Sequence, residues 1–130
     1  MKANLLNGAN LAFIGDSYYE LAIRRHLIEK GLTNQNDLHK ECVKYVSAKA
    51  HSMIYKKMEK EGFLESSEVE IFKRGRNHSY HVQRKNLDYS EYVVSSGFEA
   101  VVGYLYLMEL NDRLQEVIDF SIKVIEDKNE

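Results

Sequence analysis

Two acidic side chains in the first part of the chain lie at helical spacing inside an apolar segment. Residues 10–27 read NLAFIGDSYYELAIRRHL, in which Asp16 follows a glycine and Glu20 comes one helical turn later, on the same face. A carboxylate buried among apolar residues needs a partner, a shifted pKa or a metal ion. The alternative is that Asp16 is the N-cap of a helix that begins at Ser17. The local pattern leaves both roles open.

A third acid, Glu99, is the one charge in the interior of residues 95–110, SSGFEAVVGYLYLMEL, which read as the most buried helix of the chain. Gly103 lies one turn further on and would let another helix approach closely. If this helix packs against residues 10–27, Asp16 and Glu99 form a carboxylate pair inside a helical core. Oxygen ligands of that kind suit Mg²⁺, with Mn²⁺ as a substitute. Beside a phosphate-binding segment, such an ion favours phosphodiester hydrolysis by a nuclease.

A basic segment, Ile71 to Leu87, contains five Lys and Arg residues and no Asp or Glu, although the whole chain has a net charge of -2. Because it also contains a glycine and small polar residues, we expect a loop rather than a helix. Arginine side chains and backbone N–H groups of such a loop can bind phosphate, and a plain solvated surface is the alternative. The candidate binding residues are Lys73, Arg74, Arg76, Asn77, His78, Arg84 and Lys85, with His81 close by.

The composition predicts one all-α domain over residues 1–130. Hydrophobic residues make up 44% and charged residues 29%, as in a soluble globular protein, and there is no proline. The single cysteine, Cys42, has core spacing and excludes an internal disulfide, which fits a reducing compartment. The first residues do not resemble a signal peptide, and the apolar run 100–108 is shorter than the roughly 20 residues that span a bilayer. We therefore expect a cytoplasmic protein.

Hydrophobic periodicity and capping residues divide the chain into helices. The first should bury apolar residues on more than one side, and the last reads as a plain amphipathic helix. We expect the histidines on helices to be exposed: His26, His39 and His51. The predicted helices cover 11–30, 38–46 with a bend between 47 and 52, 53–61, 66–72, a stretch from about 89, and 112–127.

Three segments in the same order match a known family. The sequence NLAFIGDSYYEL at 10–21 resembles the signature helix of the ribonuclease III family, and SSGFEAVVGYLYL at 95–107 resembles its second catalytic helix. The short chain, the IFKRGRN segment at 71–77 and the YLYL ending are similar to the bacterial mini-ribonuclease III subfamily. The resemblance covers nearly the whole chain.

The resemblance implies an all-α ribonuclease III-type endonuclease domain that works as a homodimer, with a catalytic valley along the interface. It implies Mg²⁺-dependent cleavage of double-stranded RNA, in this subfamily the stem of precursor large-subunit (23S) ribosomal RNA. Because the apolar runs are short, we expect no membrane partner. By that match Asp16 and Glu99 are the catalytic, metal-binding acids and Glu20 is an accessory acid. The segment around Arg74 and Arg76 would grip the RNA.

Two positions depart from the larger ribonuclease III enzymes, which carry a glutamate four residues before the signature aspartate and an aspartate three residues before the second glutamate. These positions are Ala12 and Ser96 here, which leaves the number of metal ions open. No separate double-stranded-RNA-binding domain is expected, so the catalytic domain must hold RNA alone, with strong salt dependence. Two alternatives are an inactive scaffold for structured RNA and a helical adaptor that binds an acidic protein. Metal-dependent cleavage would exclude both.

Overall fold

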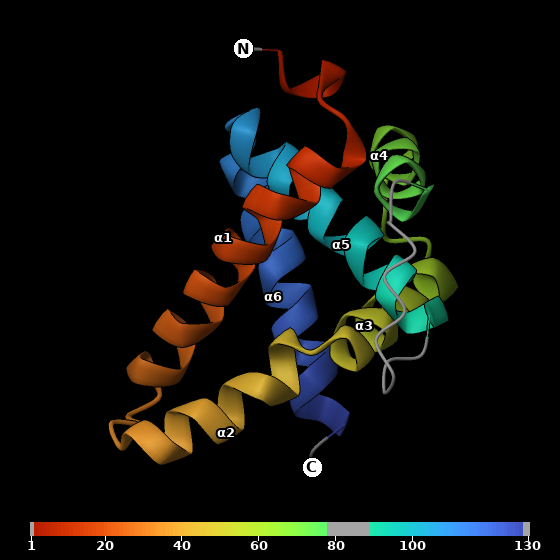
Figure 1. Ribbon diagram of the computed structural model, residues 1–130. Helices are drawn as coiled ribbons and strands as arrows, with labels where there is room; N and C mark the ends of the chain where they lie inside the picture. The colour runs from red at the N-terminus through yellow and green to blue at the C-terminus, as the bar shows by residue number, and fades with distance from the viewer. Residues whose placement is uncertain (1, 78–88, 129–130) are drawn as a thin grey trace.

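Helices make up every element of the protein in a computed structural model that describes residues 2–77 and 89–128 (Figure 1). The all-α class predicted from the composition is confirmed for this part of the chain. None of these helices is long and apolar enough to cross a membrane. The elements are the 3₁₀-helix η1 (Ala3–Leu5) and the α-helices α1 (Gly8–Glu29), α2 (Gln35–Val46), α3 (Ala48–Glu61), α4 (Ser66–Asn77), α5 (Tyr89–Leu107) and α6 (Asn111–Lys128).

Local capping sets several of the helix boundaries. The Asn7 side chain accepts a hydrogen bond from the N–H of Asn10 (2.8 Å) at the start of α1. Ser47 separates α2 from α3, and its hydroxyl accepts from the N–H of Ala50 (3.1 Å), so the predicted bend is a break at one residue. Gly62 ends α3 in the left-handed region (φ 61°), a conformation that glycine adopts without strain.

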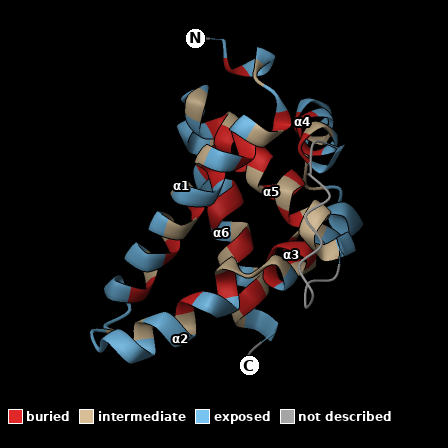
Figure 2. Ribbon diagram, in the orientation of Figure 1, coloured by how far each residue is buried: buried red, intermediate tan, exposed pale blue. Residues whose placement is uncertain are grey.

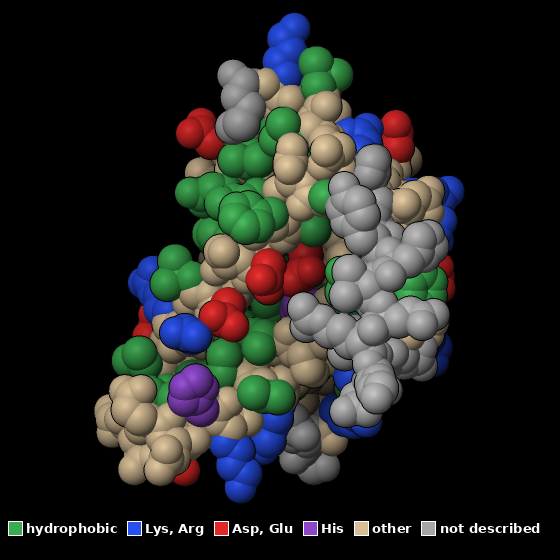
Figure 3. All heavy atoms as spheres, in the orientation of Figure 1, with side chains coloured by type: hydrophobic (Ala, Val, Ile, Leu, Met, Phe, Trp, Pro, Cys, Tyr) green, Lys and Arg blue, Asp and Glu red, His purple; other side chains and the backbone are tan. Residues whose placement is uncertain are grey.

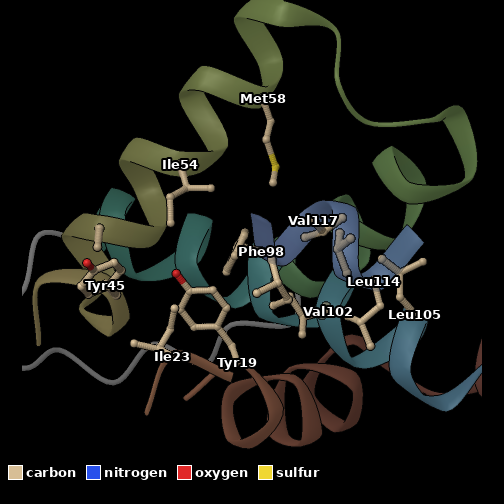
Figure 4. Close-up of a cluster of buried hydrophobic side chains, with 14 of the residues drawn as sticks. Tyr19, Ile23, Tyr45, Ile54, Met58, Phe98, Val102, Leu105, Leu114 and Val117 are labelled. Carbon is tan, nitrogen blue, oxygen red and sulfur yellow. The ribbon is translucent and has the colours of Figure 1, made fainter. Parts of the chain in front are cut away.

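Helix α5 lies at the centre of the fold and contacts α1, α3, α4 and α6 (Figure 1). Its residues Phe98, Val102 and Leu105 are buried, and the inner sides of the neighbouring helices are buried with them (Figure 2). In the core drawn in Figure 4, Tyr19 of α1 meets Phe98 edge to face, with ring centroids 5.2 Å apart. The deep burial predicted for residues 95–110 is confirmed at these positions.

Helix α4 extends further than the sequence pattern predicts. The pattern predicts a loop from Ile71, but the helix continues to Asn77, so this prediction was wrong for 71–77. Phe72 and Gly75 are buried against α5, where a Cβ added at Gly75 would lie 2.5 Å from the Cβ of Ala100. The glycine therefore serves helix packing and not a turn. The rest of the predicted loop lies outside the described residues.

A carboxylate on α6 joins three helices. Glu126 Oε2 lies 2.8 Å from His26 Nε2 and accepts hydrogen bonds from Lys30 Nζ (3.0 Å) and Tyr45 Oη (2.9 Å). Burial alone would raise the pKa of Glu126, but these three groups lower it to about 2. An ionised carboxylate therefore holds α1 and α2 against the end of α6.

A second acidic side chain, Glu68, is 1% exposed and ion-paired. It accepts hydrogen bonds from Arg113 Nε and Nη2, both at 2.8 Å, and from the N–H of Glu65 at 2.9 Å. The same guanidinium donates to the carbonyl oxygen of Phe63 (2.7 Å). Because both carboxylate oxygens have donors, the buried pair fastens the start of α4 to α6.

Candidate active site

Two glycines bring the backbones of α1 and α5 into direct contact. A Cβ added at Gly15 would overlap the carbonyl oxygen of Glu99, and one added at Gly103 would overlap the carbonyl oxygen of Leu11. Both obstacles are backbone atoms, which cannot rotate away as a side chain can. The close approach predicted at Gly103 is confirmed, and it places the two acidic helices against each other.

Asp16 and Glu99 meet at this crossing. Asp16 lies in the middle of α1, whose N-cap is Asn7, so the alternative role of Asp16 as a helix cap is wrong. Asp16 is exposed, whereas Glu99 is half-buried. Burial, a side-chain hydrogen bond with Asp16 and the charge of Asp16 raise the pKa of Glu99 to about 9. At neutral pH the Glu99 carboxyl group therefore keeps its proton unless a cation replaces it.

Glu20 lies on the same helix but has a different partner. Its Oε2 accepts a hydrogen bond from Arg24 Nη2 (3.0 Å), one turn further along α1. Both residues line a hollow of about 280 Å³ between α1 and α2, together with Cys42, whose predicted core position is confirmed by its 8% exposure. Within residues 2–77 and 89–128, no three Asp, Glu, His or Cys side chains are grouped to hold one metal ion. Glu20 is therefore not placed as a third ligand beside Asp16 and Glu99.

A histidine near the acidic pair is buried, contrary to the exposed position predicted from the sequence. His51 of α3 is 1% exposed, and its Nδ1 lies 2.8 Å from Ser95 Oγ of α5. Its ring packs against Phe98 and Tyr19, with centroids 4.8 Å and 4.9 Å apart. These contacts link α1, α3 and α5 close to the crossing that carries the acids.

The environment keeps His51 neutral. Burial lowers its pKa to about 4, and the charge of nearby Asp16 opposes this shift only in part. The sequence did contain a signal for the burial, because His51 lies one and two turns before the buried residues Ile54 and Met58, on the same face of α3. Sequence reasoning missed it by treating histidine as a surface residue.

One of the predicted phosphate-binding arginines has a structural contact. Arg74 Nη1 donates to the carbonyl oxygens of Asn4 (2.6 Å) and Leu6 (3.2 Å), and so holds the N-terminal segment against α4. A further, weak ion pair joins Arg74 to Glu70 on the same helix at 3.9 Å. The Arg74 guanidinium therefore makes most of its polar contacts within the protein.

The other candidate RNA-binding residues of α4 lie near its C-terminal end. Lys73 and Arg76 are exposed, and the Arg76 guanidinium lies 5.9 Å from the centroid of the Phe72 ring. Asn77 accepts a hydrogen bond from Arg76 Nε (3.3 Å). The remaining candidates lie outside the described residues: His78, Arg84 and Lys85, with His81 between them.

Several large apolar side chains face the solvent. Phe13 is 80% exposed and Leu21 is 65% exposed, so the prediction that α1 buries its apolar residues on more than one side was wrong for these two positions of the single chain. Leu5 and Tyr106 are exposed as well. Figure 3 shows hydrophobic side chains gathered beside acidic ones near the middle of the displayed face. Within the described part of the chain, no element covers this side of α1.

A hard divalent cation fits the acidic pair. Asp16 and Glu99 form no ion pair with another described residue, so no Lys or Arg side chain there balances negative charge at the pair. Mg²⁺ in proteins is commonly held by one or two carboxylates, with waters and substrate phosphates as the other ligands. The two carboxylates supply such a partial set, and the donor chemistry therefore suits Mg²⁺ or Mn²⁺.

Comparison with known proteins places this site in a family. Residues 9–109, which include both acids, match the Ribonuclease III domain family. The chain is 49% identical to Mini-ribonuclease 3 of Streptococcus pneumoniae, covering 95% of this chain and 96% of the relative. It is 42% identical to Mini-ribonuclease 3 of Enterococcus faecalis, with coverage of 96% and 95%. A Fusobacterium nucleatum protein solved by X-ray crystallography aligns with a TM-score of 0.80 at 32% identity, over 92% of this chain and 93% of that protein. The chain therefore belongs to the ribonuclease III family of endoribonucleases.

Proposed function

We propose that the protein is a divalent-metal-dependent endoribonuclease that hydrolyses phosphodiester bonds of double-stranded RNA at the Asp16–Glu99 pair. Membership of the ribonuclease III family supports the reaction class. As the natural substrate we propose the stem of a precursor of large-subunit ribosomal RNA, and as the natural ion Mg²⁺.

The observation that carries the proposal is the meeting of Asp16 and Glu99 where α1 crosses α5, and the raised pKa of Glu99 supports it. Backbone contact between α1 and α5 holds the two carboxyl groups together, so they repel each other when both are ionised. Groups with strongly shifted pKa values cluster at functional sites. A divalent cation would relieve the repulsion by taking the place of the proton on Glu99. The arrangement therefore favours metal binding.

The chain's own residues have distinct parts in the proposed reaction. When bound, Mg²⁺ supplies a Lewis acid for phosphate oxygens and lowers the pKa of water. Asp16 and Glu99 would hold the ion, and the packing of α1 on α5 fixes the separation of their carboxylates. His51 stays neutral and adds no positive charge that would compete with the ion. Because Ala12 and Ser96 add no carboxylate, water and substrate phosphate must complete the ligand set.

The basic residues after Phe72 are the proposed RNA contacts. Exposed Lys73 and Arg76 can reach phosphates of an RNA duplex, whose shape and 2′-hydroxyls are recognised more than its bases. Arg74 would support this surface indirectly, because it holds the N-terminal segment. The other proposed contacts are Asn77, His78, Arg84 and Lys85.

We also infer that the protein works as a homodimer. Dimerisation is typical of the ribonuclease III family. The exposed Phe13 precedes Asp16 by one helical turn, and a second copy that covered this side of α1 would bury it. Such a dimer would carry two acidic pairs, one for each strand of a duplex.

The test is cleavage of a labelled RNA duplex with Mg²⁺ or with EDTA, by the wild type, Glu99→Gln and Glu91→Gln. Glu91 is a matched control, because it is a half-buried glutamate on the same helix, two turns before Glu99. We expect cleavage by the wild type and the control with Mg²⁺ only, and none by Glu99→Gln. Full activity of Glu99→Gln would contradict the proposed site.

Binding of the duplex by all three proteins without cleavage would favour the scaffold alternative. The source of the substrate is tested separately, by comparing a precursor large-subunit stem with an unrelated duplex of equal length. Equal rates on both would refute a preference for the ribosomal stem and leave the nuclease activity intact.

A further inference from the structure

A groove between α3 and α6 is lined by lysines. It has a volume of about 790 Å³ and runs along the second half of α3 and the last turns of α6. The two helices pack against each other on the C-terminal side of the fold (Figure 1). Neither residue of the acidic pair lines this groove. We call it the lysine groove, and its rim lysines are Lys56, Lys57, Lys60, Lys123 and Lys128.

The lysine groove is strongly positive for a chain of net charge -2. Its five lysines face only two acids in the lining, Glu61 and Asp127. Lys57 pairs with Glu61 at 3.2 Å. The other four lysines form no ion pair with any residue in 2–77 or 89–128. Positive charge is therefore concentrated here, and an ion pair neutralises only Lys57.

Compensation of the helix dipoles explains only part of this charge. Lys60 and Lys128 lie in the last turns of α3 and α6, where a cation interacts favourably with the helix end. Lys56, Lys57 and Lys123 lie further inside their helices, and the dipole effect falls off within one turn. Lys57 is paired with Glu61, so Lys56 and Lys123 are the lysines that neither effect explains, and they point to an anionic ligand.

The floor of the lysine groove is apolar. It is formed by Met53, Phe120 and Val124, all partly exposed. Phe120 stacks on Phe63 with ring centroids 4.3 Å apart, which supports the ring from one side. A purely solvated lysine surface does not need such a floor, whereas flat aromatic ligands such as RNA bases pack on apolar and aromatic side chains.

We propose that the lysine groove binds a single-stranded RNA segment that flanks the cleaved stem. Lysines on both sides would contact successive phosphates, and unpaired bases would lie on Met53, Phe120 and Val124. A duplex fits this arrangement less well, because its bases are stacked inside and it offers only phosphates and sugars to the rim. The inference rests on the proposed function for RNA as the substrate, but it uses none of the catalytic residues.

The experiment measures binding of a labelled oligouridylate, which has no stable secondary structure, by fluorescence anisotropy over a range of salt concentrations. It compares the wild type with Lys56→Gln/Lys60→Gln and with the control Lys40→Gln/Lys44→Gln. The control removes two exposed lysines at the same helical spacing on α2, outside the groove. All four positions are on the surface, so the variants should fold.

We expect the groove variant to bind oligouridylate more weakly, by up to about 25-fold near 0.1 M salt, with a salt slope smaller by about 1.4, because two phosphate contacts are lost. The control should bind like the wild type. Glu99→Gln should also bind like the wild type, which separates this inference from the proposed catalytic site. Lys123→Glu, on the opposite wall, should weaken binding as well.

Three outcomes would overturn the inference. Equal losses of oligouridylate affinity in the groove and control variants would mean that any surface lysine contributes equally to binding. Equal binding of a base-free oligomer with the same number of phosphates would exclude a role for the apolar floor. Tighter groove-dependent binding of polyglutamate than of oligouridylate would assign the groove to an acidic protein instead. These three comparisons measure binding and not cleavage, so the result of the Glu99→Gln cleavage test does not affect them.

Discussion

Replacing Glu99 by glutamine should abolish cleavage and, at the same time, stabilise the metal-free protein. The side chain keeps its size and its ability to donate a hydrogen bond to Asp16, but it can no longer ionise. In the wild type the folded protein holds a proton on Glu99 up to about pH 9, whereas the ordinary pKa is 4.5. The stability that the protonated group contributes is therefore complete below pH 4.5 and is lost as the pH rises toward 9.

The size of the effect follows from these two pKa values. Between pH 4.5 and pH 7 the loss would be about 3 kcal/mol for a fully buried group, and about 2 kcal/mol for the half-buried Glu99. The glutamine side chain of Glu99→Gln avoids this loss, so the melting temperature of the variant at pH 7 should be about 6–10 °C higher than that of the wild type. At pH 4 the two proteins should melt at the same temperature.

The assay is thermal unfolding in EDTA at several pH values, followed by circular dichroism, with Glu91→Gln as the control. Saturating Mg²⁺ should raise the melting temperature of the wild type and have little effect on Glu99→Gln, because the variant lacks one of the two ligands. A variant that is less stable than the wild type at pH 7, or a stability difference that does not depend on pH, would refute the repulsion between Glu99 and Asp16.

Three further substitutions test other parts of the structure. Gly15→Ala puts a methyl group onto the carbonyl oxygen of Glu99. It should lower the free energy of unfolding by about 3 kcal/mol in urea titrations and abolish cleavage. An unchanged urea midpoint would mean that α1 and α5 lie further apart. Phe13→Asp should convert a dimer into a folded monomer in size-exclusion chromatography with light scattering, and a variant that remains dimeric would place the interface elsewhere. Arg113→Met leaves the Glu68 carboxylate buried without its partner and should cost about 3–5 kcal/mol in urea unfolding, whereas Arg113→Met with Glu68→Met should recover most of the loss. A double variant as unstable as the single one would show that packing, and not charge, sets the cost.

The boundaries of several helices could be predicted because their causes are local. Gly62 adopts a left-handed conformation at the end of α3, and small polar residues mark the break between α2 and α3 at Ser47. The end of helix α4 was predicted wrongly because the prediction used only local preferences. Gly75 and the basic residues around it favour a loop locally, but burial of Phe72 and the close packing of Gly75 on Ala100 outweigh that preference.

Burial at single positions could not be read from the chain in the same way. Periodicity shows that a helix has an apolar side, but not which side the neighbouring helices cover. His51 was expected outside and lies inside, whereas Phe13 and Leu21 were expected inside and are exposed. These errors concern residues whose surroundings come from distant parts of the chain.

By itself, the sequence determined the helical class, the family and the candidate acids, because helix propensity, the absence of proline and the short motifs around Asp16 and Glu99 are all local properties. Only the tertiary structure decided that these acids meet, since their contact depends on two helices, far apart in the chain, that touch backbone to backbone at Gly15 and Gly103. It also decided the raised pKa of Glu99 and the positive charge of the lysine groove. Each of these properties arises from charges and surfaces that distant segments bring together. A local sequence pattern does not show which distant segments are in contact.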